Sequence, residues 1–172
     1  MLGGFVAVMA FPGLGAWAGE GDGLTLDFSH RSRFEALHNQ FRPGLGSGDH
    51  GYVLRTRAAL NYARGGLRLG AEVLDARAYG LAPHSSADGN LVDVFEPLVA
   101  FVGWEGAIGD ERRLSLRAGR LTPSFGAGRL VGRNGYRNMP NAFTGALAEV
   151  TAEDRRLQLF ALSPQRRLPG NF

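Results

Sequence analysis

The chain has 172 residues, a formal net charge of +3 and no cysteine. This length suits one domain with a core, and the missing cysteines exclude disulfides and a cysteine zinc site. All 19 basic residues are arginine and 26 residues are glycine, which favours tight turns over long helices.

The N-terminal segment has the pattern of a secretory signal peptide. Gly4 to Leu14 is an uncharged apolar run, and Ala16-Trp17-Ala18 follows as a small-x-small cleavage site. We therefore predict a signal peptide over residues 1–18; a short buried helix is the alternative. No later segment approaches the roughly 20 apolar residues of a membrane-spanning helix. The remaining residues, 19–172, are then either soluble outside the cytoplasm or a membrane β-barrel.

Leu24 to Ala36 alternates between apolar and polar residues over thirteen positions. Period two predicts a strand with one apolar and one charged face, and Arg31, Arg33 and Glu35 lie on the charged face. The strand exceeds the roughly 9 to 11 residues that cross a bilayer. A soluble sandwich would show the same alternation, but in shorter strands.

The next two strands form a predicted hairpin. After a polar loop over Leu37 to Gly51, Tyr52 to Ala63 alternates again and carries Arg55 and Arg57 on its polar side. Arg64-Gly65-Gly66 makes a tight turn, and Leu67 to Tyr79 returns with Glu72 on its polar side. At Leu74 the alternation of apolar and polar residues changes phase, and Asp75 and Arg77 follow as polar residues of the same parity. We therefore expect a bulge near Val73 and Leu74.

The second half of the chain again alternates long loops with short turns. Pro97 cannot donate to a sheet ladder, so we expect a bulge or local break beside Glu96. The expected segments, in order, are a loop over Gly80 to Asn90, a strand over Leu91 to Trp104, a turn over Gly106 to Arg113, a strand over Leu114 to Leu121, a long loop to Asn141, and a hairpin of Thr144 to Thr151 with Leu157 to Ser163.

About seven strands and this loop asymmetry predict an all-β fold, an antiparallel transmembrane β-barrel whose short turns are periplasmic. Bacterial single-chain barrels have even strand numbers of 8 or more. An open sheet would leave lipid-facing surface and two unpaired edges. We therefore expect a partial barrel, the N-terminal portion of a longer one.

Charged residues on the polar strand positions and on the loop after Leu121 are the candidate solute-binding groups. Guanidinium groups offer bidentate sites to carboxylates at successive heights, and the carboxylates would hold the arginines apart. The alternative is that these charges pair with one another and fill a wet interior. An arginine-rich codon bias also explains the absence of lysine. The set is Arg31, Arg33, Arg55, Arg57, Arg77, Arg117, Arg120, Arg129, Arg133, Arg137, Glu35, Glu72, Asp75 and Glu96.

Several blocks resemble the alginate export family of outer-membrane porins. They are Arg33-Phe34-Glu35, Phe41-Arg42-Pro43-Gly44, Leu54-Arg55-Thr56-Arg57, Glu72 to Tyr79, Glu96-Pro97-Leu98 and Arg117 to Arg133, in the family's order. The resemblance implies a barrel of roughly eighteen strands, wide enough for an aqueous channel. It also implies an arginine-rich constriction that passes an anionic polysaccharide or another acidic solute.

No enzymatic motif stands out. The four histidines lack ligand spacing, and the sequence has no Walker loop, Gly-x-Ser-x-Gly elbow or HExxH. We expect no enzyme activity, cofactor, metal or nucleic-acid partner. Expected partners are outer-membrane lipid of a Gram-negative bacterium and an anionic polysaccharide or small acidic solute. The sequence leaves open whether the protein also has periplasmic export partners. The alternative function is a secreted soluble β-sheet module that binds acidic glycans.

Overall fold

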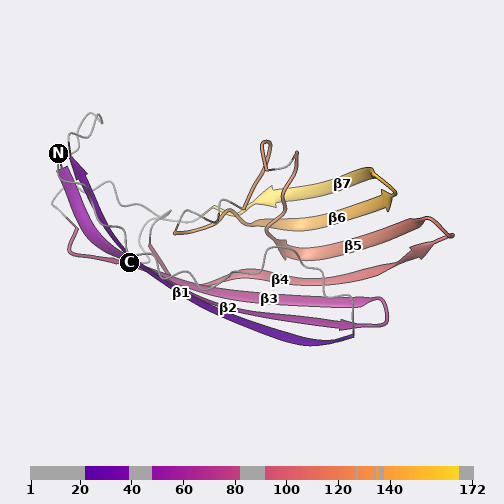
Figure 1. Ribbon diagram of the computed structural model, residues 1–172, viewed down its shortest axis with the longest axis horizontal. Coiled ribbons are helices and arrows are strands. Elements are labelled where there is room, and N and C mark those ends of the chain that lie inside the picture. Colours follow the sequence, from indigo (N-terminus) through magenta and orange to yellow (C-terminus); the bar gives the residue numbers. More distant parts are fainter. Residues whose placement is uncertain are drawn as a thin grey trace.

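A computed structural model describes residues 22–38, 48–81, 92–126, 128–133, 135 and 138–166. They form one antiparallel sheet in which the strands follow each other in sequence order (Figure 1). The predicted signal peptide lies outside the described residues. The strands are β1 (Gly23–His38), β2 (Gly48–Arg64), β3 (Leu67–Tyr79), β4 (Asp93–Ile108), β5 (Arg112–Leu121), β6 (Phe143–Ala152) and β7 (Arg155–Pro164).

The seven strands and the all-β class predicted from alternation are confirmed. The predicted turn over Gly106 to Arg113 is too long, because Gly106 and Ile108 still pair with β5. Of the two glycines in that segment, only Gly109 adopts a positive φ, 65°, and the turn is confined to residues 109–111. No helix in the described ranges is long and apolar enough to cross a membrane.

The two faces of the sheet differ in chemistry. We call the face covered by the described residues between 122 and 142 the inner face, and the opposite one the outer face. The outer face carries large apolar side chains that no other part of the described chain covers: Leu26, Phe28 and Leu159 are 72%, 68% and 65% exposed. The inner face of β1 to β3 carries most of the charged residues of these strands, such as Arg31, Arg55 and Glu72. This division is that of a barrel wall with lipid outside and a wet lumen inside.

The irregularity expected near Pro97 of β4 is confirmed. The bulge predicted near Val73 and Leu74 of β3 is wrong, because the additional residues lie on β4. The β3–β4 register shifts between Glu72 and Val73, and again between Leu74 and Ala76. The additional residues belong to β4, where Phe95 has a φ of 59°. Because β3 keeps an unbroken register with β2, its side chains alternate to Tyr79 without a change of parity.

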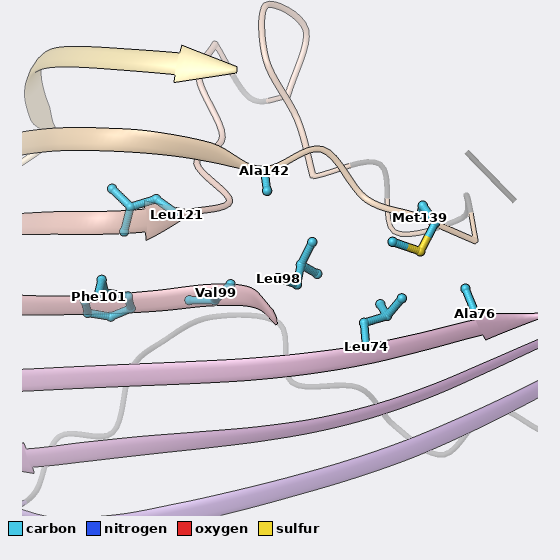
Figure 2. Packing of buried hydrophobic residues seen from close by; sticks show 8 residues of the cluster. All are labelled: Leu74, Ala76, Leu98, Val99, Phe101, Leu121, Met139 and Ala142. Atoms are coloured by element: carbon cyan, nitrogen blue, oxygen red, sulfur yellow. The ribbon is translucent and has the colours of Figure 1, made fainter. Parts of the chain in front are cut away.

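The buried cluster lies between the inner face of the sheet and the β5–β6 loop, residues 122–142. Figure 2 shows Met139 and Ala142 of this loop above the labelled side chains of β3 and β4, with Leu121 of β5 to one side. A single sheet has no second layer to pack against, so the loop supplies one. The cluster consists of Leu74, Ala76, Leu98, Val99, Phe101, Leu121, Met139 and Ala142, with Leu147 and Leu162 packed against it.

Candidate functional site

An arginine bridges two carboxylates on the inner face of β1 to β3. Asp27, Ala59 and Glu72 are cross-strand neighbours in one row, so a single small side chain separates the two acids. Arg57 lies two residues before Ala59 on β2, so its side chain is on the same face. Its Nη1 lies 2.7 Å from Asp27 Oδ1 and its Nε lies 3.0 Å from Glu72 Oε1. The alternation of β2 therefore places Arg57 where it can pair with both neighbouring strands.

Glu72 also holds the β5–β6 loop against the sheet. Its side chain is only 1% exposed, and it forms an ion pair with Arg133 of the loop as well as with Arg57. Arg133 Nη1 also donates to Thr122 Oγ1 at 3.2 Å. A buried carboxylate with two guanidinium partners is the arrangement in which the cost of burying charge is offset. Glu72 thus ties the loop to the wall.

Two further arginines converge on the same loop. Arg31 and Arg55 face each other across β1 and β2, and both donate to the carbonyl oxygen of Gly135, at 3.5 Å and 2.9 Å. Arg31 Nη2 also donates to Asn138 Oδ1 at 3.2 Å. Like charges directly opposite each other in a ladder repel, so this pair concentrates positive potential at one point of the inner face.

Asn138 fastens the loop to β2 from the other side. Its side chain is fully buried, and its Nδ2 donates to the carbonyl oxygen of Leu54 at 3.1 Å. The loop carries its own hairpin, in which Phe125 pairs with Val131. The Phe125 ring stacks on Phe160 of β7, with centroids 4.3 Å apart. The loop therefore contacts both the first and the last strand of the sheet.

The structure separates the other predicted site residues. Arg33 pairs with Glu35 on the inner face of β1, and Arg117 lies over the Phe101 ring at 5.9 Å. Arg120 pairs with Glu96. It lies in an outer-face row with Ala100 and Thr144, so it does not share a face with Arg117. Arg129 is exposed in the hairpin of the loop, and Arg137 lies outside the described residues.

The placement of Asp75 and Arg77 corrects the sequence-based assignment. We predicted both on the polar, lumen-facing side, reached through a bulge in β3. The β2–β3 register has no such shift, so both residues share the outer face with Leu67 and Leu69. They pair with each other there, with Arg77 Nε 2.9 Å from Asp75 Oδ2.

Sequence reasoning left out two polar residues of this site. Asp27 belongs to the charged set of β1, so the alternation that selected Arg31 could have selected it. Asn138 carries no such signal, because its contacts are made with residues more than 80 positions away. Within the described ranges, no group of three or more His, Asp or Glu could hold a metal ion. The site's chemistry is therefore that of guanidinium, carboxylate and amide groups.

The fold and the site together define a class of protein. A single antiparallel sheet with an apolar outer face, and a charged inner face under its own loop, is part of a transmembrane β-barrel of the channel type. The sequence matches the family described as Alginate export over residues 22–170, and the chain belongs to this family. It is a transport family of outer-membrane porins in Gram-negative bacteria. Searches of curated proteins and of solved structures gave no match.

Proposed function

We propose that this chain forms part of an outer-membrane channel that passes an anionic polysaccharide or another acidic solute along an arginine-lined lumen. The observation that carries the proposal is the convergence of Arg31 and Arg55 on Gly135 of a loop that covers the inner face. A loop held against the wall by arginines narrows the lumen at the height where the positive charge is concentrated. A narrow, positively charged passage favours anions.

The arginines divide into two groups with different roles. Arg57 and Arg133 are held by Asp27 and Glu72, and we assign them the task of fixing the loop. Arg31 and Arg55 form the like-charged pair; besides their contact with Gly135 of the loop, we assign them to the solute. A carboxylate beside this pair would receive charge-assisted hydrogen bonds from both guanidinium groups. A uronate chain could then move from this pair to the next arginine.

The proposal places the chain in the outer membrane, with further strands that pair with β1 and β7 and close the barrel. All seven described strands belong to one sheet, and β1 and β7 are its edges. The exposed apolar outer face supports a lipid environment. A soluble glycan-binding sandwich would need a second sheet against that face, and the described residues contain none.

Ion selectivity of the full-length protein in planar bilayers tests this function. We expect anion selectivity under a salt gradient and block by oligouronates. In Arg31→Gln/Arg55→Gln the reversal potential should move towards zero and the oligouronate block should weaken, because the concentrated positive charge is gone. Arg112→Gln is the matched control. Arg112 is an exposed arginine at the opposite end of the sheet, in an outer-face row with Ile108 and Ala152.

Two results would contradict the proposal. One is cation selectivity of the wild-type channel. The other is a double variant whose selectivity and oligouronate block equal those of Arg112→Gln. In the second case the arginines only fill the wet interior, which is the alternative that the sequence left open.

A further inference from the structure

Two rows of mostly polar side chains cross the outer face of β1 to β3 near the long loops. The cross-strand neighbours are His30, Thr56 and Asp75 in one row, and Ser32, Leu54 and Arg77 in the next. The rows on the side of the short turn are apolar, beginning with Phe28, Ala58 and Val73. The outer face therefore changes from apolar to polar partway along these three strands.

A row of three aromatic residues follows the polar rows. Phe34, Tyr52 and Tyr79 are cross-strand neighbours, and the first two rings are 5.0 Å apart. Tyr52 and Tyr79 are more than half exposed. Aromatic residues are enriched at the interfaces of membrane barrels, where one end of the ring is apolar and the other is wet. This row marks the interface on the side of the long loops.

The polar groups are ordered, and they point away from the lumen. Arg77 uses its Nε for Asp75 at 2.9 Å, and its side chain is 46% exposed. The carboxylate thus orients the guanidinium, and nearly half of the side chain is accessible from outside. His30 Nδ1 and Thr56 Oγ1 are 3.0 Å apart, in the row beside Arg77. Arg77 thus offers an oriented donor to an anion that approaches from the membrane side.

The depth of these rows can be derived from strand geometry. Arg77 is ten residues from Leu67, the outward residue at the short turn. Ten residues rise about 33 Å along a strand, which is about 25 Å along the membrane normal at a tilt of about 40°. The apolar band of an outer-membrane barrel is about 25 Å tall. Arg77 therefore reaches the headgroup level of the leaflet on the side of the long loops, which is the external leaflet when the short turns are periplasmic.

We propose that Arg77, oriented by Asp75 and flanked by His30, Thr56 and the aromatic row, binds the phosphorylated headgroup of a glycolipid of the external leaflet. The inference rests on the proposed function in one respect, that the sheet lies in an outer membrane. Phosphate is the matching chemistry because a guanidinium donates to it through two parallel hydrogen bonds. Acyl chains of the same lipid would lie on the apolar rows that begin at Phe28.

Native mass spectrometry of the detergent-purified full-length protein tests this site with diphosphoryl lipid A as the probe. Lipid A with both phosphates removed is the ligand control. We expect Arg77→Ala to bind the diphosphoryl form more than about tenfold more weakly, the effect of losing one hydrogen bond between charged groups. Arg77→Lys should retain part of the affinity. Arg64→Ala is the matched control, since Arg64 is an exposed arginine at the short-turn end of β2.

The outcomes separate this inference from the channel proposal. Equal affinity of wild type and Arg77→Ala, an equal loss in Arg64→Ala, or equal binding of the dephosphorylated lipid would each overturn the glycolipid site. A change in the number of protein copies with unchanged lipid binding would also overturn it, and would make the surface an interface between copies. Ion selectivity of Arg77→Ala should equal that of wild type. A wild-type protein that binds the diphosphoryl form selectively but does not conduct would refute the channel alone.

Discussion

Glu72 is the residue on which the geometry of the inner face depends most. Its side chain is almost fully buried, and it faces one arginine of the sheet and one of the loop. Removing one partner of a buried ion pair costs more than the pair itself contributes, because the remaining charge stays buried. The substitution of Glu72 should therefore loosen the loop as well as destabilise the sheet.

Glu72→Gln should lower the free energy of unfolding in lipid vesicles by about 1.5–3 kcal/mol, the range for hydrogen bonds to charged groups. Urea unfolding of the full-length protein measures it. Glu105→Gln is the matched control. Glu105 also faces two arginines, Arg68 and Arg113, but its side chain is 27% exposed. Its substitution should cost less than about 1 kcal/mol. Equal losses in the two variants would show that burial of Glu72 does not set the cost.

Alternation predicted the faces of single residues well where the strand is regular. Arg31, Arg33, Arg55 and Arg57 lie on the inner face, as their parity predicts. The prediction failed at Arg77 because Leu74, Asp75 and Ala76 were interpreted as a shift of phase. In the structure Leu74 is instead an apolar residue on the inner face, buried under the β5–β6 loop. The sequence of β3 alone contains no sign of that cover.

At the scale of elements, two glycines allow neighbouring strands in the β4, β5, β6 and β7 part of the sheet to lie close together. Gly119 of β5 pairs with Gly145 of β6, and their φ values are 129° and 152°. A Cβ on Gly145 would lie 2.0 Å from the carbonyl oxygen of Ala161 in β7, and one on Gly119 would lie 2.3 Å from that of Ala100 in β4. Only glycine adopts these angles without strain.

Gly145→Ala should therefore weaken the pairing of β6 with β7. We expect a loss of about 1–3 kcal/mol, as for other residues held in backbone regions that side chains avoid. The temperature at which the folded band disappears in a gel of unboiled full-length protein should fall. Ala146→Val is the control, because Ala146 is the next residue of β6 and is exposed on the outer face. A normal transition temperature for Gly145→Ala would contradict the close approach.

The limits of most strands could be predicted from the sequence, whereas the position of the long loop could not. Period two and the glycine turns determine where strands such as Leu67–Tyr79 begin and end. The docking of the loop depends on Arg31, Arg55 and Asn138, which lie between 80 and 107 residues from their partners. No local pattern encodes a contact over that separation. The docked position of the loop is therefore a property of the folded sheet.

At the scale of the whole molecule, the outer face predicts how the protein behaves on extraction. Leu24, Leu26 and Phe28 of β1 and Leu157 and Leu159 of β7 are each more than half exposed. An apolar surface of this extent is stable only against lipid, detergent or another protein. We expect the full-length protein in the membrane fraction, released by detergent and not by salt or alkali, with heat-modifiable migration on gels.

Fractionation of the producing cells measures this directly. A periplasmic marker protein serves as the soluble control. Recovery of the full-length protein in the periplasmic extract without detergent would refute the membrane assignment and would favour a soluble glycan-binding module.

The strict order of the strands also has a kinetic consequence. Each strand contacts only its neighbours in the sequence, so the sheet itself needs no distant pairing. Contacts that close short loops form faster than contacts that close long ones. The docking of residues 122–142 on β1 and β2 is different, because it joins segments a hundred positions apart. We therefore expect the loop to dock late, after the first five strands have assembled, so that the proposed channel would be transiently wide before it is narrowed by the loop.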